Sequence, residues 1–202
     1  DVRYAAGRKV NQHNYLVHYD GRFWAMWSDG PGIPRTDDPI KHRDIVPGHD
    51  KSGQLVSFSI SEDGVNWSEP RNLAGPPDPG FGWIARGFWI REGKLLALAT
   101  RYNAPSYRGK GLQLHAFEMV PNECSPNWKH LGVVYDNAMN NFPPKKLPNG
   151  KWMMSRRDSL GNVHMLVGGN KAFDQWESFP VISYQDEELH AEEPYWLTLP
   201  DD

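Results

Sequence analysis

A β-hairpin closed by glycine recurs along this chain, and this repeat constrains the fold more than any other feature. Two short apolar runs flank a Gly-centred turn at 15–28, at 88–101 and at 145–157. Glycine adopts the positive φ that a tight hairpin turn requires. The turn glycines are Gly21, Gly93 and Gly150, which are 72 and 57 residues apart. The sequence therefore repeats one hairpin three times.

Each of these hairpins is followed by a second strand pair with a tryptophan: Trp67, Trp128 and Trp176. Repeats of about 50 residues with about four strands are typical of a β-propeller, whose blades are four-stranded sheets around a channel. We therefore expect an all-β fold, with innermost strands at 15–19, 86–91 and 142–147. A fourth copy begins at 192–202, where we expect another innermost strand at 193–199.

These repeats predict about three blades and one further strand of a propeller that has about six blades in the full protein. Residues 1–202 would form part of a single propeller domain that is truncated at its C-terminus, because the last hairpin stops inside its turn. The remainder of the propeller or a second chain would then be needed to close the ring and to cover its strand edges.

Composition excludes several classes of partner and site. The net charge of −3 and the pI near 6.3 give no reason to expect nucleic acid, and no apolar run approaches the ~20 residues that span a membrane. The single cysteine, Cys124, excludes an internal disulfide and a cysteine-cluster metal site.

The nine tryptophans divide into two groups by context. Most of them lie in alternating strand patterns, which predict packing in the blade cores. Trp83 follows the Gly- and Pro-rich stretch P-P-D-P-G-F-G, where we expect it to stay outside the core and to stack on a sugar ring. His115 and His130 fall within strands and are expected to be structural.

The blade connections opposite the hairpin turns should bring polar strand ends together at the mouth of the channel. The candidates from innermost strands are His13, Arg86, Asn140, Asn141, Glu192 and Glu193, and those from second strands are Arg101, Tyr102, Arg156 and Arg157. A guanidinium group binds a carboxylate through two parallel hydrogen bonds, so three exposed arginines at equivalent ends favour an anionic, polyhydroxylated ligand.

The loop 29–53 carries many charges and lies between the first and second strand pairs. Asp37, Asp38 or Asp44 could reach over the channel as a general acid, or the loop could be an ordinary solvated segment. The spacing of its histidines and carboxylates matches no defined calcium or zinc motif, so we expect neither a metal nor a cofactor.

Several stretches of the sequence resemble a known family. The turn S-E-D-G-V-N-W at 61–67 is similar to the Asp-box (BNR repeat) of the sialidase (neuraminidase) superfamily, one residue shorter than usual. The stretches A-R-G-F-W-I-R-E-G-K and N-N-F-P-P-K-K-L-P-N-G-K-W resemble bacterial proteins described as exo-alpha-sialidase-like. The resemblance implies a carbohydrate-active propeller, a secreted glycosidase (a hydrolase) that binds an acidic or complex glycan in an extracellular or periplasmic setting.

The resemblance also implies roles for site residues. Arg86, Arg101 and either Arg156 or Arg157 would bind the substrate carboxylate, Glu192 or Glu193 would activate a tyrosine nucleophile located beyond residue 202, and Asp37, Asp38 or Asp44 would be the acid/base. The family's F/Y-R-I-P motif is absent, and G-I-P-R at 32–35 has only its Arg, Ile and Pro, in another order.

Three alternatives remain open at this stage. The adjacent pair Glu192-Glu193 could act in a glycosidase without tyrosine chemistry, since mutual repulsion raises one pKa. A polysaccharide lyase could use His13, Tyr102 or Arg101 beside a uronate carboxylate. A non-catalytic glycan-binding propeller would need only aromatic and amide groups.

Overall fold

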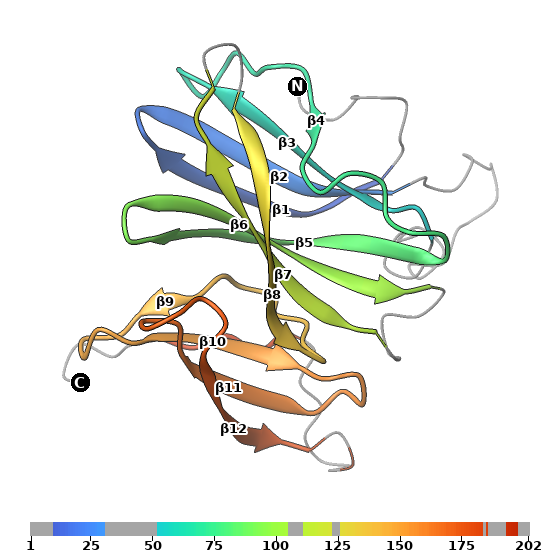
Figure 1. Cartoon of the computed structure of the whole chain (residues 1–202), viewed down its shortest axis with the longest axis vertical. Coiled ribbons are helices and arrows are strands. Elements are labelled where there is room, and N and C mark those ends of the chain that lie inside the picture. The colour runs from blue at the N-terminus through green and yellow to red at the C-terminus, as the bar shows by residue number, and fades with distance from the viewer. Residues whose placement is uncertain are drawn as a thin grey trace.

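The chain folds into three separate four-stranded antiparallel sheets, seen as three stacked layers in a computed structural model (Figure 1). The structure describes residues 10–30, 52–104, 111–122, 126–183, 185 and 193–197. The first sheet has the order β1-β2-β3-β4, with β1 (Val10–Tyr19), β2 (Arg22–Gly30), β3 (Leu55–Ser61) and β4 (Arg71–Asn72). The second contains β5 (Phe81–Arg91), β6 (Lys94–Asn103), β7 (Gln113–Val120) and β8 (Asn127–Asp136). The third contains β9 (Lys145–Lys146), β10 (Trp152–Arg157), β11 (Val163–Gly168) and β12 (Trp176–Ile182).

This arrangement confirms the predicted all-β fold of propeller blades. Strands follow one another within each sheet in chain order, from an innermost to an outermost strand. The innermost strands β1 and β5 extend further toward the N-terminus than expected, whereas β9 is only two residues long. Of the strand expected at 193–199, residues 193–197 are described, and they are not assigned to a strand. The described residues include no helix that could cross a membrane.

The predicted glycine turns close the first hairpin of each blade. Asp20 and Gly21 have φ values of 52° and 70°, and Glu92 and Gly93 have φ values of 52° and 76°. Positive φ at both central residues defines the type I′ turn that matches the twist of paired strands. Gly150 closes the third hairpin with φ 81°.

An ion pair lies at the hairpin-turn end of every blade, on the left in Figure 1. It joins a cation at or just after the turn to a glutamate on or near an outer strand. The pairs are Arg22–Glu62 at 3.9 Å, Lys94–Glu118 at 2.9 Å and Lys151–Glu177 at 3.7 Å. Exposed pairs of this kind contribute about 0–1 kcal/mol each. Their recurrence shows that the three blades are structural equivalents.

The first core lies between the first and second sheets. Side chains that alternate along the strands meet there, among them Trp24, Phe58, Phe88 and Phe117. Trp128 on β8 bridges the two blades, since its ring lies 5.8 Å from that of Trp24 and 5.7 Å from that of Phe58. Full burial of side chains such as these contributes about 1.5–3 kcal/mol each.

A second core lies between the second and third sheets. Trp89 sits at its centre, with ring centroids 5.4 Å from Trp152 and 5.7 Å from Trp176. Trp128 and Trp176 therefore anchor the blades, as the repeat predicts. Trp67, which the repeat also predicts to be a core residue, is not part of the described cores.

Trp83 is a correction to the sequence analysis. It lies inside β5, is 7% exposed, and packs in the first core against Phe117 and His115 rather than standing in a loop. The Gly- and Pro-rich stretch ends just before the strand begins at Phe81, so the alternation of β5 decides where Trp83 points.

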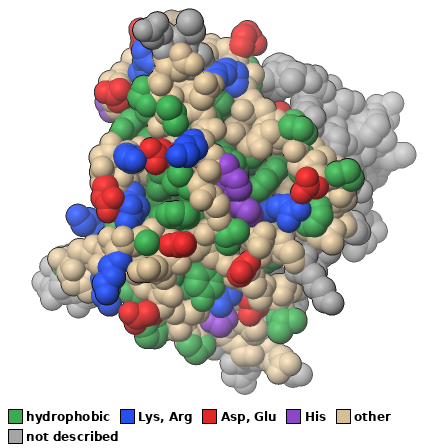
Figure 2. Space-filling view, in the orientation of Figure 1, with side chains coloured by type: hydrophobic (Ala, Val, Ile, Leu, Met, Phe, Trp, Pro, Cys, Tyr) green, Lys and Arg blue, Asp and Glu red, His purple; other side chains and the backbone are tan. Residues whose placement is uncertain are grey.

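Figure 2 shows that acidic and basic side chains are interspersed on the face turned toward the viewer, with histidines near its middle. This distribution agrees with the small net charge of −3 and gives no single-sign surface for a polyanion on this face.

Candidate functional site

Two β-bulges in neighbouring innermost strands shape the candidate site. The pairing of β1 with β2 shifts between Gln12 and Tyr15, and that of β5 with β6 shifts between Ala85 and Phe88. A bulge inserts unpaired residues and re-aims their side chains. The bulged residues include His13 with φ 51° and Gly87 with φ 95°, next to Arg86.

Gly87 allows the innermost strands to approach one another closely. A Cβ atom at this position would lie 2.9 Å from Pro143 Cδ and 3.0 Å from Tyr15 Cδ1. Residues from all three blades therefore meet around the bulge of β5. We call the group Tyr15, Arg86, Asn140, Asn141, Arg157 and Glu193 the axial cluster.

Arg86 lies at the centre of the axial cluster and is 1% exposed, so it is buried rather than solvent-exposed as expected. Burial lowers the pKa of its guanidinium to about 10, and the positive charge of Arg157 acts in the same direction. Tyr15 and Glu193 oppose this shift, Tyr15 through its hydrogen bond with Arg86 and Glu193 through its negative charge.

Tyr15 links the axial cluster across the blades. Its hydroxyl donates to the backbone oxygen of Asn141 at 2.6 Å and is hydrogen-bonded to Arg86. Burial raises the pKa of this hydroxyl; Arg86 acts against the shift, and Glu193 adds to it. Tyr15 is therefore a neutral phenol that positions Arg86. It was missed in the sequence analysis, although it directly follows the polar run Gln12-His13-Asn14 on the same strand.

Several buried polar atoms of the axial cluster have no hydrogen-bond partner among the described residues. They are Nε and Nη1 of Arg86, Oδ1 of Asn140 and Oδ1 of Asn141. Asn140 is fully buried and donates through Nδ2 to the backbone oxygen of Phe142 at 2.8 Å. Unpaired buried donors are costly, and they are rare in folded proteins unless a ligand or a water satisfies them.

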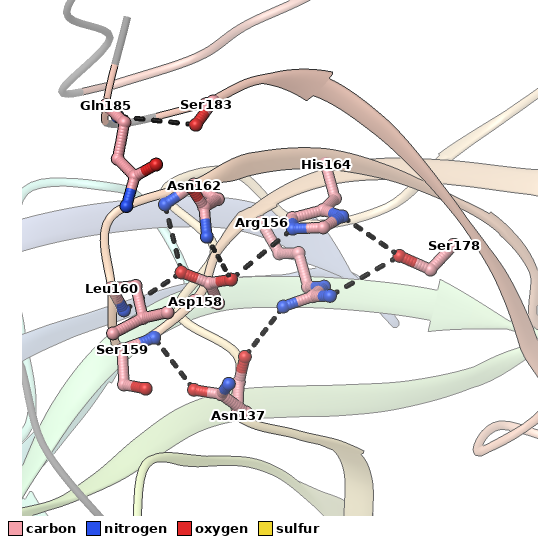
Figure 3. Close-up of polar contacts among 10 residues, drawn as sticks. All are labelled: Asn137, Arg156, Asp158, Ser159, Leu160, Asn162, His164, Ser178, Ser183 and Gln185. Atoms are coloured by element: carbon pink, nitrogen blue, oxygen red, sulfur yellow. Dashed lines mark hydrogen bonds and ion pairs between the residues drawn. The ribbon is translucent and has the colours of Figure 1, made fainter.

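Arg157, not Arg156, joins Arg86, because adjacent residues on β10 point to opposite faces. Arg156 donates to the backbone oxygen of Asn137 at 2.9 Å and to Ser178 Oγ at 3.4 Å (Figure 3). Its guanidinium also lies over the ring of Tyr135. These contacts tie β10 to the end of the second blade.

Asp158 organises the connection that follows Arg157 (Figure 3). Its carboxylate accepts hydrogen bonds from the backbone N–H groups of Leu160 and Asn162, both at 2.9 Å, and lies 3.4 Å from His164 Nε2. Burial alone would raise the pKa of Asp158, but the hydrogen bonds together lower it below its usual value. This loop is thus held by internal contacts beside the axial cluster.

Arg101 makes its contacts with residues outside the axial cluster. It donates to Asp78 at 2.7 Å and stacks over the ring of Phe81 at 3.6 Å. Tyr102, the next residue, is fully buried and packs on the backbone of Gly82. His13 lies at the bulge of β1, with Nδ1 3.2 Å from Ser28 Oγ. The structure thus brings together Arg86, Arg157 and Glu193, and Tyr15 links them to the backbone oxygen of Asn141, next to the buried Asn140. Arg101, Arg156, Tyr102 and Trp83 make their contacts elsewhere.

The remaining predicted site residues lie outside the described residues. They are Asp37, Asp38, Asp44 and Glu192. Within the described part of the chain, no group of three or more His, Cys, Asp or Glu side chains is placed to hold a metal ion.

The fold is similar to that of solved sialidases. A mutant of Trypanosoma rangeli sialidase displaying trans-sialidase activity matches with a TM-score of 0.55 and 13% identity, over 85% of this chain and 30% of that chain. Trypanosoma rangeli sialidase in complex with sialic acid gives a TM-score of 0.51 and 14% identity, over 85% and 30%. A protein of unknown function from Dyadobacter fermentans gives 0.51 and 14%, over 84% of this chain and 51% of that chain.

No family model matches the sequence, and no curated protein matches it. The chain spans 30% of the length of these two sialidases and 51% of the Dyadobacter protein. At identities of 13–14%, what is shared is the fold: three blades of a sialidase-like β-propeller.

Proposed function

We propose that this chain is part of a carbohydrate-active propeller, a sialidase-like glycoside hydrolase that binds an acidic glycan at the axial cluster. The observation that carries the proposal is Arg86. This residue is 1% exposed, lies near the like charge of Arg157, and has two guanidinium nitrogens, Nε and Nη1, without a partner among the described residues. A carboxylate ligand would satisfy these donors and offset the repulsion between the two arginines.

The other members of the cluster suit a sugar ring. The amide oxygens of Asn140 and Asn141 would accept hydrogen bonds from its hydroxyl groups. Glu193 is the carboxylate that acts on both Tyr15 and Arg86, and we assign it the role of activating or acid/base group. Glu192, Asp37, Asp38 and Asp44 remain proposed catalytic carboxylates, and we expect the protein to meet its glycan in an extracellular or periplasmic setting.

A non-catalytic glycan-binding propeller is the second candidate. The described axial cluster contains two guanidinium groups and two amides but a single carboxylate, Glu193. Binding an acidic sugar needs the first four groups, whereas hydrolysis needs a nucleophile and an acid/base group, of which the described cluster offers only Glu193. The lyase alternative is weakened, because Tyr102 is fully buried and Arg101 is paired with Asp78.

The experiment compares R86M with R101M in the complete protein. Methionine fills much of the volume of arginine and carries no charge, and replacing a buried charged group by an apolar one is often neutral or stabilising. R86M should therefore stay folded but bind N-acetylneuraminic acid and galacturonic acid oligomers at least about 30-fold more weakly, as expected for a buried charge–charge contact.

R101M is the matched control, since its guanidinium is engaged by Asp78 outside the cluster. We expect its affinity for the acidic glycan to change by less than about fivefold. Calorimetric titration measures both, and release of reducing sugar separates hydrolysis from binding alone. Unchanged affinity of R86M would contradict the proposal, and binding without turnover by the wild-type protein would favour the non-catalytic candidate.

A further inference from the structure

A groove of about 590 Å³ lies at the outer rim, between the β3–β4 turn of the first blade and the loop that follows β7 in the second. Its walls include Arg22, Glu62, Asn66, Trp67, Asn122 and Pro126. The volume falls in the range of roughly 300–1,000 Å³ that is usual for small-molecule sites. None of these residues belongs to the axial cluster.

The β3–β4 turn holds one wall of this groove rigidly. Ser61 Oγ accepts from the backbone N–H of Gly64 at 2.8 Å, and Asp63 Oδ1 accepts from those of Val65 and Asn66 at 2.8 and 2.7 Å. These hydrogen bonds lower the pKa of Asp63 well below its usual range. The carboxylate is thus occupied by the turn itself, and the turn presents the residues after it in a fixed geometry.

Trp67 and Asn66 are the groups that this turn presents. The indole Nε1 of Trp67 donates to Gly64 O at 3.2 Å, which fixes the ring, and Trp67 lines the groove. Asn66 Nδ2 donates to Asp63 Oδ2 at 2.7 Å, and no described group donates to its Oδ1. An aromatic face beside a free amide oxygen is suited to an object with an apolar face and hydroxyl edges.

The charged groups of the groove offset one another, so the groove has little preference for a charged ligand. Arg22 and Glu62 face each other at 3.9 Å and offset one another, and Asp63 is occupied by the turn. Asn122, which is exposed on the opposite wall, adds a second amide. A neutral saccharide matches this surface, because its C–H face stacks on an indole and its hydroxyl groups pair with amides and with the ion pair.

The third blade carries a similar groove at its own turn between β11 and β12. It has a volume of about 420 Å³ and is lined by Lys151, Asn170, Lys171, Asp174, Trp176 and Glu177. The indole of Trp176 is also fixed by a backbone oxygen, that of Phe173 at 2.8 Å, and an ion pair again crosses the site. Much of this ring packs against Trp89 in the second core, so it offers less surface than Trp67 does.

We propose that the rim groove beside Trp67 binds a neutral sugar residue of a glycan chain, independently of the axial cluster. The equivalent groove of the third blade would bind the same class of ligand more weakly. Both lie at the end of the blades that carries the hairpin turns, whereas Arg157 ends β10 on the side of the longer blade connections (Figure 1). A long chain could thus be held on the outside of the propeller.

The test follows the nine indole N–H signals of the protein by nuclear magnetic resonance. The probes are the neutral oligosaccharides cellotriose, maltotriose and N-acetyllactosamine, each titrated to about 10 mM. At least one of them should shift the signal of Trp67, and that of Trp176 should shift only at higher concentration. A proline-rich peptide is titrated in parallel, since such peptides also stack on tryptophan.

Three variants identify the groove. W67L should abolish the binding. N122A should weaken it about 3–10-fold, which is the effect of one lost hydrogen bond. Asn122 lies in a loop, so this substitution should leave the blade folded. R86M should leave it within twofold, which separates this proposal from the function proposed for the axial cluster. The inference would be overturned by a Trp67 signal that no neutral saccharide moves, by shifts that only the peptide causes, or by wild-type affinity in both W67L and N122A.

Discussion

The histidine pair of the second blade, in which His115 is buried, should make the stability of this protein fall in mild acid. His115 on β7 is 6% exposed, and its Nδ1 lies 2.9 Å from Nε2 of His130 on β8. Burial lowers the pKa of His115 from 6.5 to about 4, and the nearby charges of His130 and Arg101 lower it further. Burial lowers the pKa of His130 in the same direction.

The sign and size of the effect follow from proton linkage. The unfolded chain binds a proton on His115 near pH 6.5, whereas the folded chain binds it only near pH 4. Stability is therefore complete above pH 6.5 and declines as the pH falls toward 4. At ~1.4 kcal/mol per pKa unit, the total loss is about 3 kcal/mol, of which about 2 kcal/mol falls between pH 7 and pH 5.

The assay is urea unfolding at pH 7 and pH 5 for the wild-type protein and for H115N. Asparagine does not titrate, and its side chain can still bond His130 from the position of Nδ1. The free energy of unfolding of H115N should therefore fall by about 2 kcal/mol less between the two pH values than that of the wild type. H18N is the control, because it makes the same replacement at a histidine that is exposed on β1.

Equal pH dependence of H115N and the wild type would refute the reasoning. It would mean that His115 is solvated or that it bonds a group that takes up its proton. Direct titration of the His115 ring by nuclear magnetic resonance gives a second reading, and a midpoint near 6.5 in the folded state would lead to the same conclusion.

Two further substitutions test the geometry around the axial cluster. G87A should destabilise the protein by about 2–4 kcal/mol, because φ is 95° and the new Cβ would meet Pro143 and Tyr15. The control is G93A, which has φ 76° and open space around it and should lower the stability by only about 1 kcal/mol. Thermal unfolding measures both. Y15F removes the hydroxyl that bonds Asn141 O and Arg86, so it should cost about 1–3 kcal/mol and weaken binding of an acidic sugar. Wild-type affinity and stability in Y15F would show that Tyr15 does not position Arg86.

Much of the fold could be predicted because its repeat is local. Asp20-Gly21 and Glu92-Gly93 adopt type I′ turns by their own backbone preference, and the strands on either side follow from them. Trp128 and Trp176, which lie at the start of the outer strands β8 and β12, pack between blades, whereas Trp67 of the first blade lines the rim groove. Residues a few positions apart are enough to determine these features.

The site was harder to predict because it depends on side-chain direction. Arg156 and Arg157 are neighbours on one strand, so only one of them could face Arg86, and the sequence does not say which. Arg101 pairs with Asp78, and Trp83 packs in a core, because β5 begins at Phe81 rather than later. The bulge of β5 had a signal that was overlooked: an isolated glycine, Gly87, within a strand pattern.

The bond between the Tyr15 hydroxyl and Asn141 O has a consequence for how the protein is made. Its two ends are 126 residues apart in the chain, yet they meet near the axis of the propeller. At roughly 5–20 residues per second, the ribosome takes on the order of ten seconds to synthesise that interval. During this time the first blade has emerged with its axial tyrosine unpaired and its inner strand lacking the contact from the third blade. The nascent chain therefore depends on the first core, between the first two blades, to stay compact until Asn141 arrives.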